Sequence, residues 1–162
     1  GSEMCIRDRI NMGLVKIKGV DVVLQGLWKF GNDWVFDSRL SYTYQKAQDF
    51  TDKSDKDTYG GQISYIPWHS GSAILNAGYK SWELNYSFIY TGERYDVSAN
   101  TPENYRLPWY TSDFSLAKKF SWRKYDFKLT LEVNNIFNQQ YEVVRSYPMP
   151  GTNFKFILNL TI

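Results

Sequence analysis

The sequence predicts an all-β protein, an antiparallel up-and-down meander of about seven strands. Three observations predict it: apolar and polar residues alternate over seven stretches, 18% of the residues are aromatic, and no apolar run reaches the roughly 18 residues of a membrane-spanning helix. Soluble sandwiches and transmembrane barrels both alternate in this way. Strand length, aromatic positions and loop lengths therefore have to decide between them.

The last strand, residues 152–162, shows the pattern most clearly. Every second residue from Phe154 to Ile162 is apolar, and the residues between them are mostly polar. Residues 125–135 repeat this arrangement, so two such strands in succession predict a meander.

Five further stretches alternate with the same period. In the first, Val15 and Ile17 have the opposite parity, so we expect a β-bulge near Lys18 and Gly19. In the third, the segment from Pro67 to Gly71 interrupts the pattern, so we expect one strand that is entered through an irregular segment. The five stretches are residues 20–30, 34–45, 63–79, 82–91 and 113–120.

Short and long connections alternate along the chain. The short turns are residues 31–33, 80–81 and 122–124, and the long loops are residues 48–61, 92–108 and 138–151. Because alternate connections of a meander lie at the same end, all short turns fall on one side and all long loops on the other. Outer-membrane barrels show this segregation, with short periplasmic turns and long extracellular loops, and a soluble sandwich has no reason for it.

Aromatic residues are predicted to form two girdles. Between the girdles each strand has about 9 to 11 residues, enough to cross the hydrocarbon core at a tilt. The periplasmic girdle would contain Trp28, Phe30, Trp34, Tyr79, Trp82, Phe120, Trp122 and Tyr125, and the outer girdle Tyr44, Tyr90, Tyr110 and Phe137.

A count of seven strands implies an incomplete barrel, because a single-chain bacterial barrel normally has an even number. We therefore expect the C-terminal part of a larger barrel, with an unpaired edge on each side. A hairpin turn at Pro67–Gly71 would instead give a small complete eight-stranded outer-membrane barrel with a structural or adhesion role. A soluble lipocalin-like ligand-binding barrel is the third possibility, and it requires the Phe154 face to point inward and the Lys155 face outward.

Residues 1–13 do not alternate, and we expect them to be a leader foreign to the fold, with residues 14–162 forming the barrel segment. The leader contains Cys5, the only cysteine, so an internal disulfide is excluded. The net charge of +2 gives no case for nucleic acid as a partner.

No catalytic or metal-binding pattern stands out, so neither enzyme activity nor a cofactor is expected. His69 lacks a Cys or second His to complete a metal site, and we expect it in a solvated loop. Glu83 and Glu132 are predicted on the polar face, bonded to neighbouring strands or to a plug. Four aspartates lack the central Gly and the final Glu of a calcium loop and predict a solvated loop: Asp49, Asp52, Asp55 and Asp57.

Two stretches near the end resemble the C-terminal end of TonB-dependent outer-membrane receptors. They are LEVNNIFNQQY at 131–141 and YPMPGTNFKFILNL at 147–160, supported in order by IKGVDV at 17–22, IPWHSG at 66–71, YTGERY at 90–95 and LPWYTSDFSL at 107–116. The resemblance implies a 22-stranded transmembrane barrel in the outer membrane of a Gram-negative bacterium. It also implies import of a scarce nutrient such as a ferric siderophore, haem, cobalamin or a glycan, with energy from TonB.

The resemblance further implies the partners of the segment. They are outer-membrane lipid, a missing N-terminal plug with the missing barrel strands, the TonB complex through that plug, and a small-molecule or metal-chelate ligand. As a fragment the chain is expected to be inactive in transport. Ligand contacts are expected in the extracellular loops, where Tyr and Arg combine flat contact area with charge, unless these side chains only close the loops. The candidates are Arg94, Tyr95, Tyr105, Arg106, Trp109, Tyr141, Arg145 and Tyr147.

Overall fold

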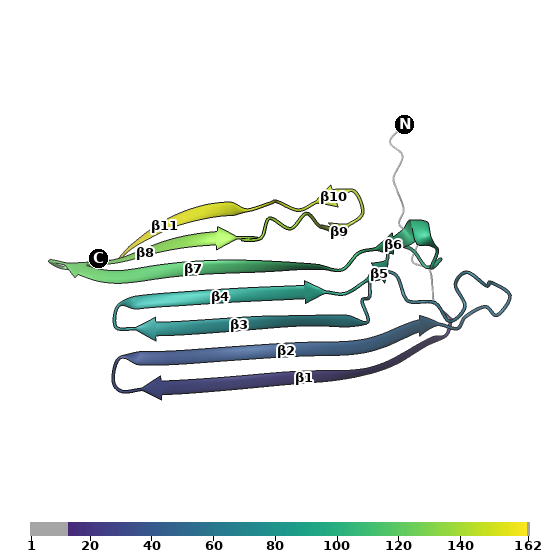
Figure 1. The fold of residues 1–162 in the computed structure, drawn as a ribbon, viewed down its shortest axis with the longest axis horizontal. Helices are drawn as coiled ribbons and strands as arrows, with labels where there is room; N and C mark the ends of the chain where they lie inside the picture. Colours follow the sequence, from purple (N-terminus) through teal and green to yellow (C-terminus); the bar gives the residue numbers. More distant parts are fainter. Residues whose placement is uncertain (1–12, 162) are drawn as a thin grey trace.

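The computed structural model describes residues 13–161 as one seven-stranded antiparallel sheet with two small two-stranded ladders beside it (Figure 1). The order of the main sheet is β1-β2-β3-β4-β7-β8-β11, which confirms the predicted meander. Its strands are β1 (Val15–Phe30), β2 (Trp34–Asp49), β3 (His69–Tyr79), β4 (Trp82–Thr91), β7 (Trp109–Trp122), β8 (Tyr125–Asn134) and β11 (Asn153–Thr161). The small elements are β5 (Arg94–Tyr95), the 3₁₀ turn η1 (Pro102–Asn104), β6 (Tyr105–Arg106), β9 (Glu142–Val144) and β10 (Tyr147–Pro148). Within residues 13–161, no helix has the length and apolarity needed to cross a bilayer.

Short turns and long loops lie at opposite ends of the sheet, as predicted (Figure 1). Each of the three short turns contains one residue with a positive φ angle: Gly31 at 60°, Lys80 at 50° and Arg123 at 57°. This left-handed conformation reverses the chain within two or three residues and keeps the register of the flanking strands. The other three connections are long and fold upon one another.

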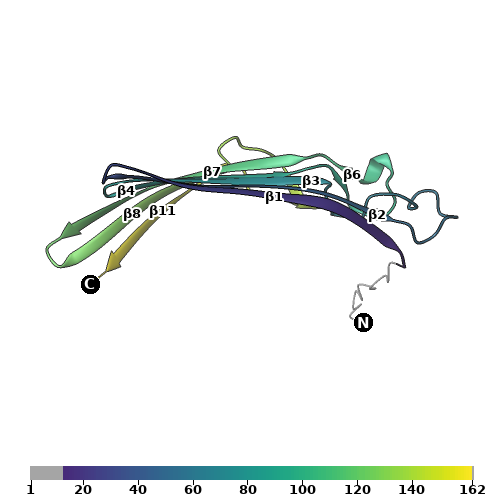
Figure 2. The ribbon, with the colours of Figure 1, turned by 90° about the horizontal axis from the view of Figure 1, so that it is seen from below.

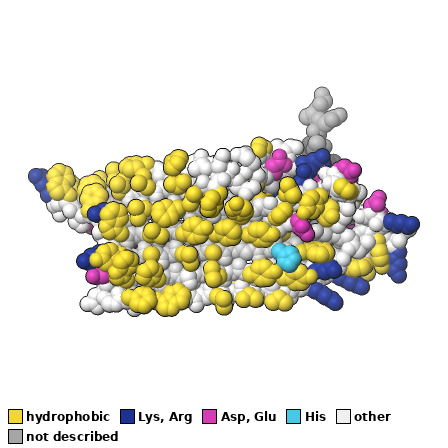
Figure 3. Space-filling model, in the orientation of Figure 1, with side chains coloured by type: hydrophobic (Ala, Val, Ile, Leu, Met, Phe, Trp, Pro, Cys, Tyr) yellow, Lys and Arg dark blue, Asp and Glu magenta, His cyan; other side chains and the backbone are white. Residues whose placement is uncertain are grey.

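The two faces of the sheet differ in chemistry. Residues in register across β2, β3, β4, β7, β8 and β11 form an apolar row of Phe36, Ala77, Leu84, Leu116, Leu131 and Phe156. The next row, which faces the other way, is Asp37, Asn76, Asn85, Ser115, Glu132 and Lys155. We call these sides the apolar face and the polar face, and Figure 3 shows the apolar face.

No second layer covers either face of the sheet among the described residues. Seen edge-on, the strands form a single thin, curved layer (Figure 2). Only three hydrophobic residues of this part are buried, Ala47, Ile63 and Ala117, whereas Phe154 is 76% and Phe156 65% exposed. A sheet with this much exposed apolar surface is stable only where something apolar covers it.

Aromatic residues gather at both ends of the apolar face. At the short turns, Trp34 stacks on Tyr79 with ring centroids 4.3 Å apart. At the long loops, Tyr110 lies 6.2 Å from Phe137 in an edge-on contact. The aromatic side chains thus lie in the two predicted bands.

The predicted bulge near Lys18 and Gly19 is wrong. The ladder between β1 and β2 runs without a shift from Val15 opposite Asp49 to Phe30 opposite Trp34. An unbroken ladder satisfies every inter-strand backbone group, whereas a bulge leaves one residue unpaired. The result is that Ile17 stays on the polar face and is 65% exposed.

The third strand begins at His69 and not at residue 63. Tyr65 has a φ of 60° and Pro67 lacks a backbone N–H, so neither continues a strand ladder. His69 therefore belongs to β3, and its predicted position in a solvated loop is wrong. Its Nδ1 lies 2.8 Å from the hydroxyl of Tyr42, at the outer aromatic band.

The eight-stranded alternative is also wrong. It required a hairpin turn at Pro67–Gly71, but Ser70 and Gly71 pair with Thr43 and Tyr42 in one continuous ladder. Among the described residues, β1 pairs only with β2 and β11 only with β8, so the sheet is open at both edges. The predicted leader, residues 1–13, lies outside the described residues except for Gly13.

Candidate functional site

Three long loops lie together at one end of the sheet. Loop 1 is residues 50–68, between β2 and β3. Loop 2 is residues 92–108, between β4 and β7, and contains β5, η1 and β6. Loop 3 is residues 135–152, between β8 and β11, and contains β9 and β10. All the predicted ligand-binding residues except Trp109, the first residue of β7, lie in loops 2 and 3.

Gln62 joins loop 1 to loop 2. Its side chain is buried, and its Nε2 donates to the carbonyl oxygens of Ile66 at 2.7 Å and Glu93 at 3.2 Å. The Nδ2 of Asn100 in turn donates to the carbonyl oxygen of Gln62 at 3.0 Å. A backbone hydrogen bond of 2.8 Å from Tyr65 to the carbonyl of Tyr95 adds to the junction, so the two loops are held at several points.

Arg94 joins loop 2 to loop 3. It is only 4% exposed, and its Nη2 donates to the carbonyl oxygens of Glu142 at 2.7 Å and Val143 at 3.2 Å. Burial lowers the pKa of Arg94 from its ordinary value, because the cation loses hydration. Its Nη1 is buried and finds no hydrogen-bond partner among residues 13–161. Arg94 is therefore a connector between loops and not an exposed contact residue.

Asp96 is the buried acid of this region, at 5% exposed. It accepts hydrogen bonds from the Nε of Arg106, at 3.0 Å, and from the Nη2 of the same guanidinium. The Nη1 of Arg145 lies 3.6 Å from the same carboxylate oxygen, which ties loop 3 to loop 2 a second time. A buried carboxylate needs such cationic partners to offset its lost hydration.

A groove of about 460 Å³ lies between loops 2 and 3. The ring of Trp109 stacks on that of Tyr141, with centroids 4.5 Å apart and planes inclined by 28°. Burial raises the pKa of Tyr141, with a smaller effect of the Asp113 carboxylate, so its phenol stays neutral at physiological pH. The indole Nε1 of Trp109 is buried and has no acceptor within the described part of the chain. The groove is lined by Tyr105, Arg106, Leu107, Pro108, Trp109, Gln139, Gln140, Tyr141, Glu142 and Pro148.

Tyr105 stands at the edge of this groove. Its hydroxyl donates to the carboxylate of Glu93 at 2.9 Å, and this bond raises the pKa of Tyr105 because the carboxylate favours the protonated phenol. Tyr95 packs edge-on against Tyr105, with ring centroids 5.8 Å apart. These contacts orient the two rings of the β5–β6 ladder.

The structure brings most of the eight predicted residues together, in different roles. Four line the groove, namely Tyr105, Arg106, Trp109 and Tyr141. Arg94, Tyr95 and Arg145 connect or orient the loops around it, while Tyr147 lies in β10 and is 71% exposed. Sequence reasoning missed Gln62, Asp96 and Asn100, which carry much of the junction. In the sequence, only Asp96 could have pointed to this junction, because it is an acid two residues after Arg94 in a loop rich in arginine and tyrosine.

The aspartates of loop 1 have structural roles. Asp52 accepts hydrogen bonds from the backbone N–H and the hydroxyl of Ser54 at 2.8 and 2.7 Å, and these bonds lower the pKa of Asp52. Asp55 accepts from the backbone of Asp57 at 3.1 Å in the same kind of turn. Within residues 13–161, no three His, Cys, Asp or Glu side chains are grouped so as to hold a metal ion.

The polar face carries ion pairs between strands, as predicted for its two glutamates. Glu83 of β4 pairs with Lys119 of β7 and, at 2.6 Å, with Lys128 of β8. Glu132 of β8 lies 3.8 Å from Lys155 of β11. These pairs balance three lysines against two glutamates within the wall itself.

An antiparallel meander with one apolar face, one polar face and segregated loops defines the wall of a transmembrane β-barrel. Residues 7–136 match the family model described as TonB dependent receptor-like, beta-barrel. The chain belongs to this family, whose members are receptors and transporters of the outer membrane that act with a plug and with TonB. This assignment argues against the lipocalin-like alternative.

Proposed function

We propose that this chain is the C-terminal barrel segment of a TonB-dependent receptor that takes up a scarce nutrient across the outer membrane of a Gram-negative bacterium. Residues 14–162 supply wall strands and extracellular loops. Further strands pair with the free edges of β1 and β11, and a plug fills the space beside the polar face and connects to TonB. By itself the segment transports nothing.

The observation that carries this proposal is the groove between loops 2 and 3. It combines the stacked rings of Trp109 and Tyr141 with the partly exposed guanidinium of Arg106. A flat ring system can lie against the aromatic side chains, and the guanidinium attracts an anion. A ferric siderophore or haem fits this set best among the nutrients named for the family, with cobalamin and glycans as alternatives.

Equilibrium dialysis of the full chain in detergent micelles tests the proposal, with a ferric tris-catecholate, haemin, cyanocobalamin and maltoheptaose as probes. Tyr141→Ala removes one of the stacked rings, and we expect it to weaken binding of the preferred probe about tenfold, the size of a stacking contribution of ~1.4 kcal/mol. Tyr59→Ala is the matched control, because Tyr59 packs on Phe50 in loop 1, outside the groove. Equal binding by both variants, or no binding of any probe, would refute the groove as the ligand site.

A further inference from the structure

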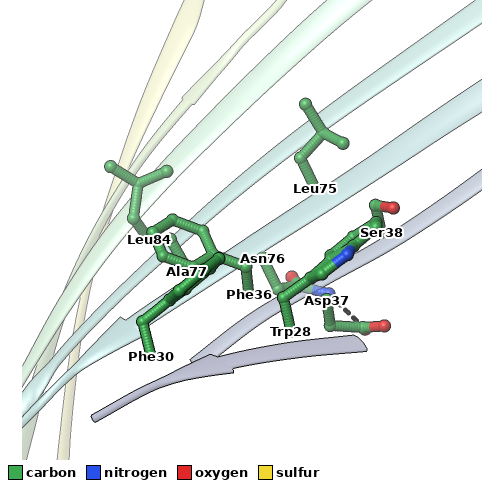
Figure 4. Close-up of a pocket in the computed structure, with 9 residues that line it drawn as sticks. All are labelled: Trp28, Phe30, Phe36, Asp37, Ser38, Leu75, Asn76, Ala77 and Leu84. Atoms are coloured by element: carbon green, nitrogen blue, oxygen red, sulfur yellow. Dashed lines mark hydrogen bonds between the residues drawn. The ribbon is translucent and has the colours of Figure 1, made fainter. Parts of the chain in front are cut away.

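A hollow of about 540 Å³ lies on the apolar face near the short turns, away from the loops. Large side chains surround it, contributed by Trp28 and Phe30 of β1, Phe36 of β2, Leu75 of β3 and Leu84 of β4. Figure 4 shows the rings of Phe30 and Phe36 close together, with Trp28 and Leu75 standing apart from them. The volume is in the range of small-molecule sites.

Small residues create this hollow. Ala77 lies between Phe36 and Leu84 in the apolar row. Ser38 lies between Gly26 and Leu75 in the adjacent row of the same face. Alternation turns the side chains of Asp37 and Asn76 to the polar face, where the Asn76 amide donates to the Asp37 carboxylate at 3.1 Å (Figure 4). Among the residues that line the hollow, Ser38 is then the one polar side chain on the apolar face.

Trp28 closes one side of the hollow. Its indole folds back over Gly26, so closely that a Cβ atom on Gly26 would lie 2.1 Å from the ring. The glycine gives the ring the space to lie flat on the sheet and not to stand up from it. The exposed fraction of Trp28 is nevertheless 49%, so its outer surface needs an apolar cover.

Cations border the hollow on the side of the short turns. One step along the strands, two residues or about 7 Å away, lies the aromatic row of Trp34, Tyr79 and Trp82. Lys118, which shares the apolar face, places its Nζ 4.3 Å from the ring centre of Trp82. The Nζ of Lys80 lies 5.2 Å from the ring centre of Tyr79 and 3.8 Å from a carboxylate oxygen of Asp33.

The same arrangement recurs at the next short turn. Arg123 lies 5.2 Å over Trp122, and the Nζ of Lys124 lies 5.3 Å over Tyr125. Long basic side chains bury their stems on apolar surface and reach the level of lipid headgroups with their charge. The hollow thus has apolar walls and a cationic rim at the headgroup level.

We propose that this hollow binds one acyl chain of an anionic glycerophospholipid, with Lys118 and Lys80 holding its phosphate group. The occupant is a phospholipid because the rim lies on the side of the short turns, which is the periplasmic side of such barrels. Its charge complements the two lysines, and its chain matches the apolar walls. The site goes beyond nutrient uptake and is independent of the groove between loops 2 and 3.

Native mass spectrometry of the full chain released from detergent micelles tests this site, with dioleoyl phosphatidylglycerol and dioleoyl phosphatidylcholine as probes. One phosphatidylglycerol should stay bound, at least about fivefold tighter than phosphatidylcholine, the ratio that one basic residue near an anionic headgroup produces. Ala77→Leu fills the hollow and should weaken binding about tenfold. The matched control is Ala73→Leu, on the same face of the same strand between Leu40 and Phe88, outside the hollow.

Lys118→Gln, with the loop 1 variant Lys53→Gln as its control, tests the headgroup contact without adding volume. It should lower the preference for phosphatidylglycerol about fivefold, because Lys80 still faces the phosphate, and leave phosphatidylcholine binding unchanged. Equal binding by the two alanine variants, equal binding of the two lipids, or equal effects of the two lysine variants would overturn the proposal. A lipid-free dimer that Ala77→Leu abolishes would assign the hollow to a second copy of the chain and overturn it as well.

Discussion

Replacing Arg94 by alanine should open loop 3 while leaving the main sheet intact. Arg94 lies in loop 2, and both hydrogen bonds of its guanidinium go to backbone carbonyls of β9 in loop 3. Alanine removes both donors at once and leaves the carbonyls of Glu142 and Val143 without these partners. None of the six ladders of the main sheet involves Arg94, so their register does not depend on it.

The size of the effect follows from these two bonds. A hydrogen bond from a charged donor is worth about 1.5 to 3 kcal/mol, and part of this is recovered when water reaches the opened carbonyls. We therefore expect loop 3 to open more easily by about 2 to 3 kcal/mol, which is roughly a 30- to 150-fold increase in its open population. Hydrogen exchange of peptides covering residues 141–150 measures this population. The reporter is the amide of Met149, which donates to the carbonyl of Tyr141 at 3.0 Å.

Arg145→Ala is the control for this experiment. Arg145 also links loops 3 and 2, but its side chain is 57% exposed and lies 3.6 Å from Asp96. Because the Arg145 side of this pair is exposed to solvent and Asp96 keeps Arg106 as its closer partner, the pair contributes about 0 to 1 kcal/mol, and exchange should rise at most about fivefold. Unchanged exchange in Arg94→Ala, or an equal increase in both variants, would show that burial of Arg94 does not hold the loops together.

Three further predictions concern the faces and the loops. In lipid, and with Cys5 changed to serine, a cysteine at Phe156 should be protected from a water-soluble maleimide while one at Lys155 reacts; protection at Lys155 would reject a lipid-facing apolar side. Asp96→Asn leaves its arginine partners without a carboxylate and should destabilise loop 2 by about 3 kcal/mol, detected as faster proteolysis there; an unchanged cleavage rate would contradict this. Burial raises the pKa of Tyr141, so the stability it contributes is fully present below its ordinary value of 10.0 and is lost as the pH rises through the folded value. The absorbance difference between the native chain and Tyr141→Phe should show phenolate forming above pH 10.0, and a step at or below that pH would argue against burial of this phenol.

The strands could be predicted because a strand alternates with a period of two residues, and this alternation is visible in the local sequence. In β11, Phe154 lies on the apolar face and Lys155 on the polar face. The ladders continue these two faces across six strands, from β11 to β2. Errors arose where local chemistry overrides the period. Tyr65 adopts a positive φ in a stretch that still alternates, and Ile17 tolerates the polar face because an unbroken ladder is worth more than its burial.

The loops could be predicted only by residue type. Arg94 and Glu142 are 48 positions apart, and Gln62 and Asn100 are 38 apart, with no periodicity to connect them. A surface loop rich in arginine and tyrosine is expected to bind ligands, yet the same side chains can satisfy buried backbone carbonyls. Which of the two roles a residue takes depends on contacts between distant segments, and so Arg94 was predicted as a ligand contact and is found as a connector.

The distribution of charged side chains gives an independent argument about the surroundings of each face. On the polar face, three lysines of β7, β8 and β11 are matched by carboxylates: Lys119 and Lys128 by Glu83, and Lys155 by Glu132. On the apolar face, Lys118 has an aromatic ring under its ammonium group and no carboxylate within ion-pair distance among the described residues. If water surrounded both faces equally, there would be no reason for lysines to have carboxylate partners on one face and for Lys118 to have none on the other. A lipid surface with anionic headgroups does, because it supplies the missing counter-charge at the level of the aromatic band and excludes charge from the rest of the face.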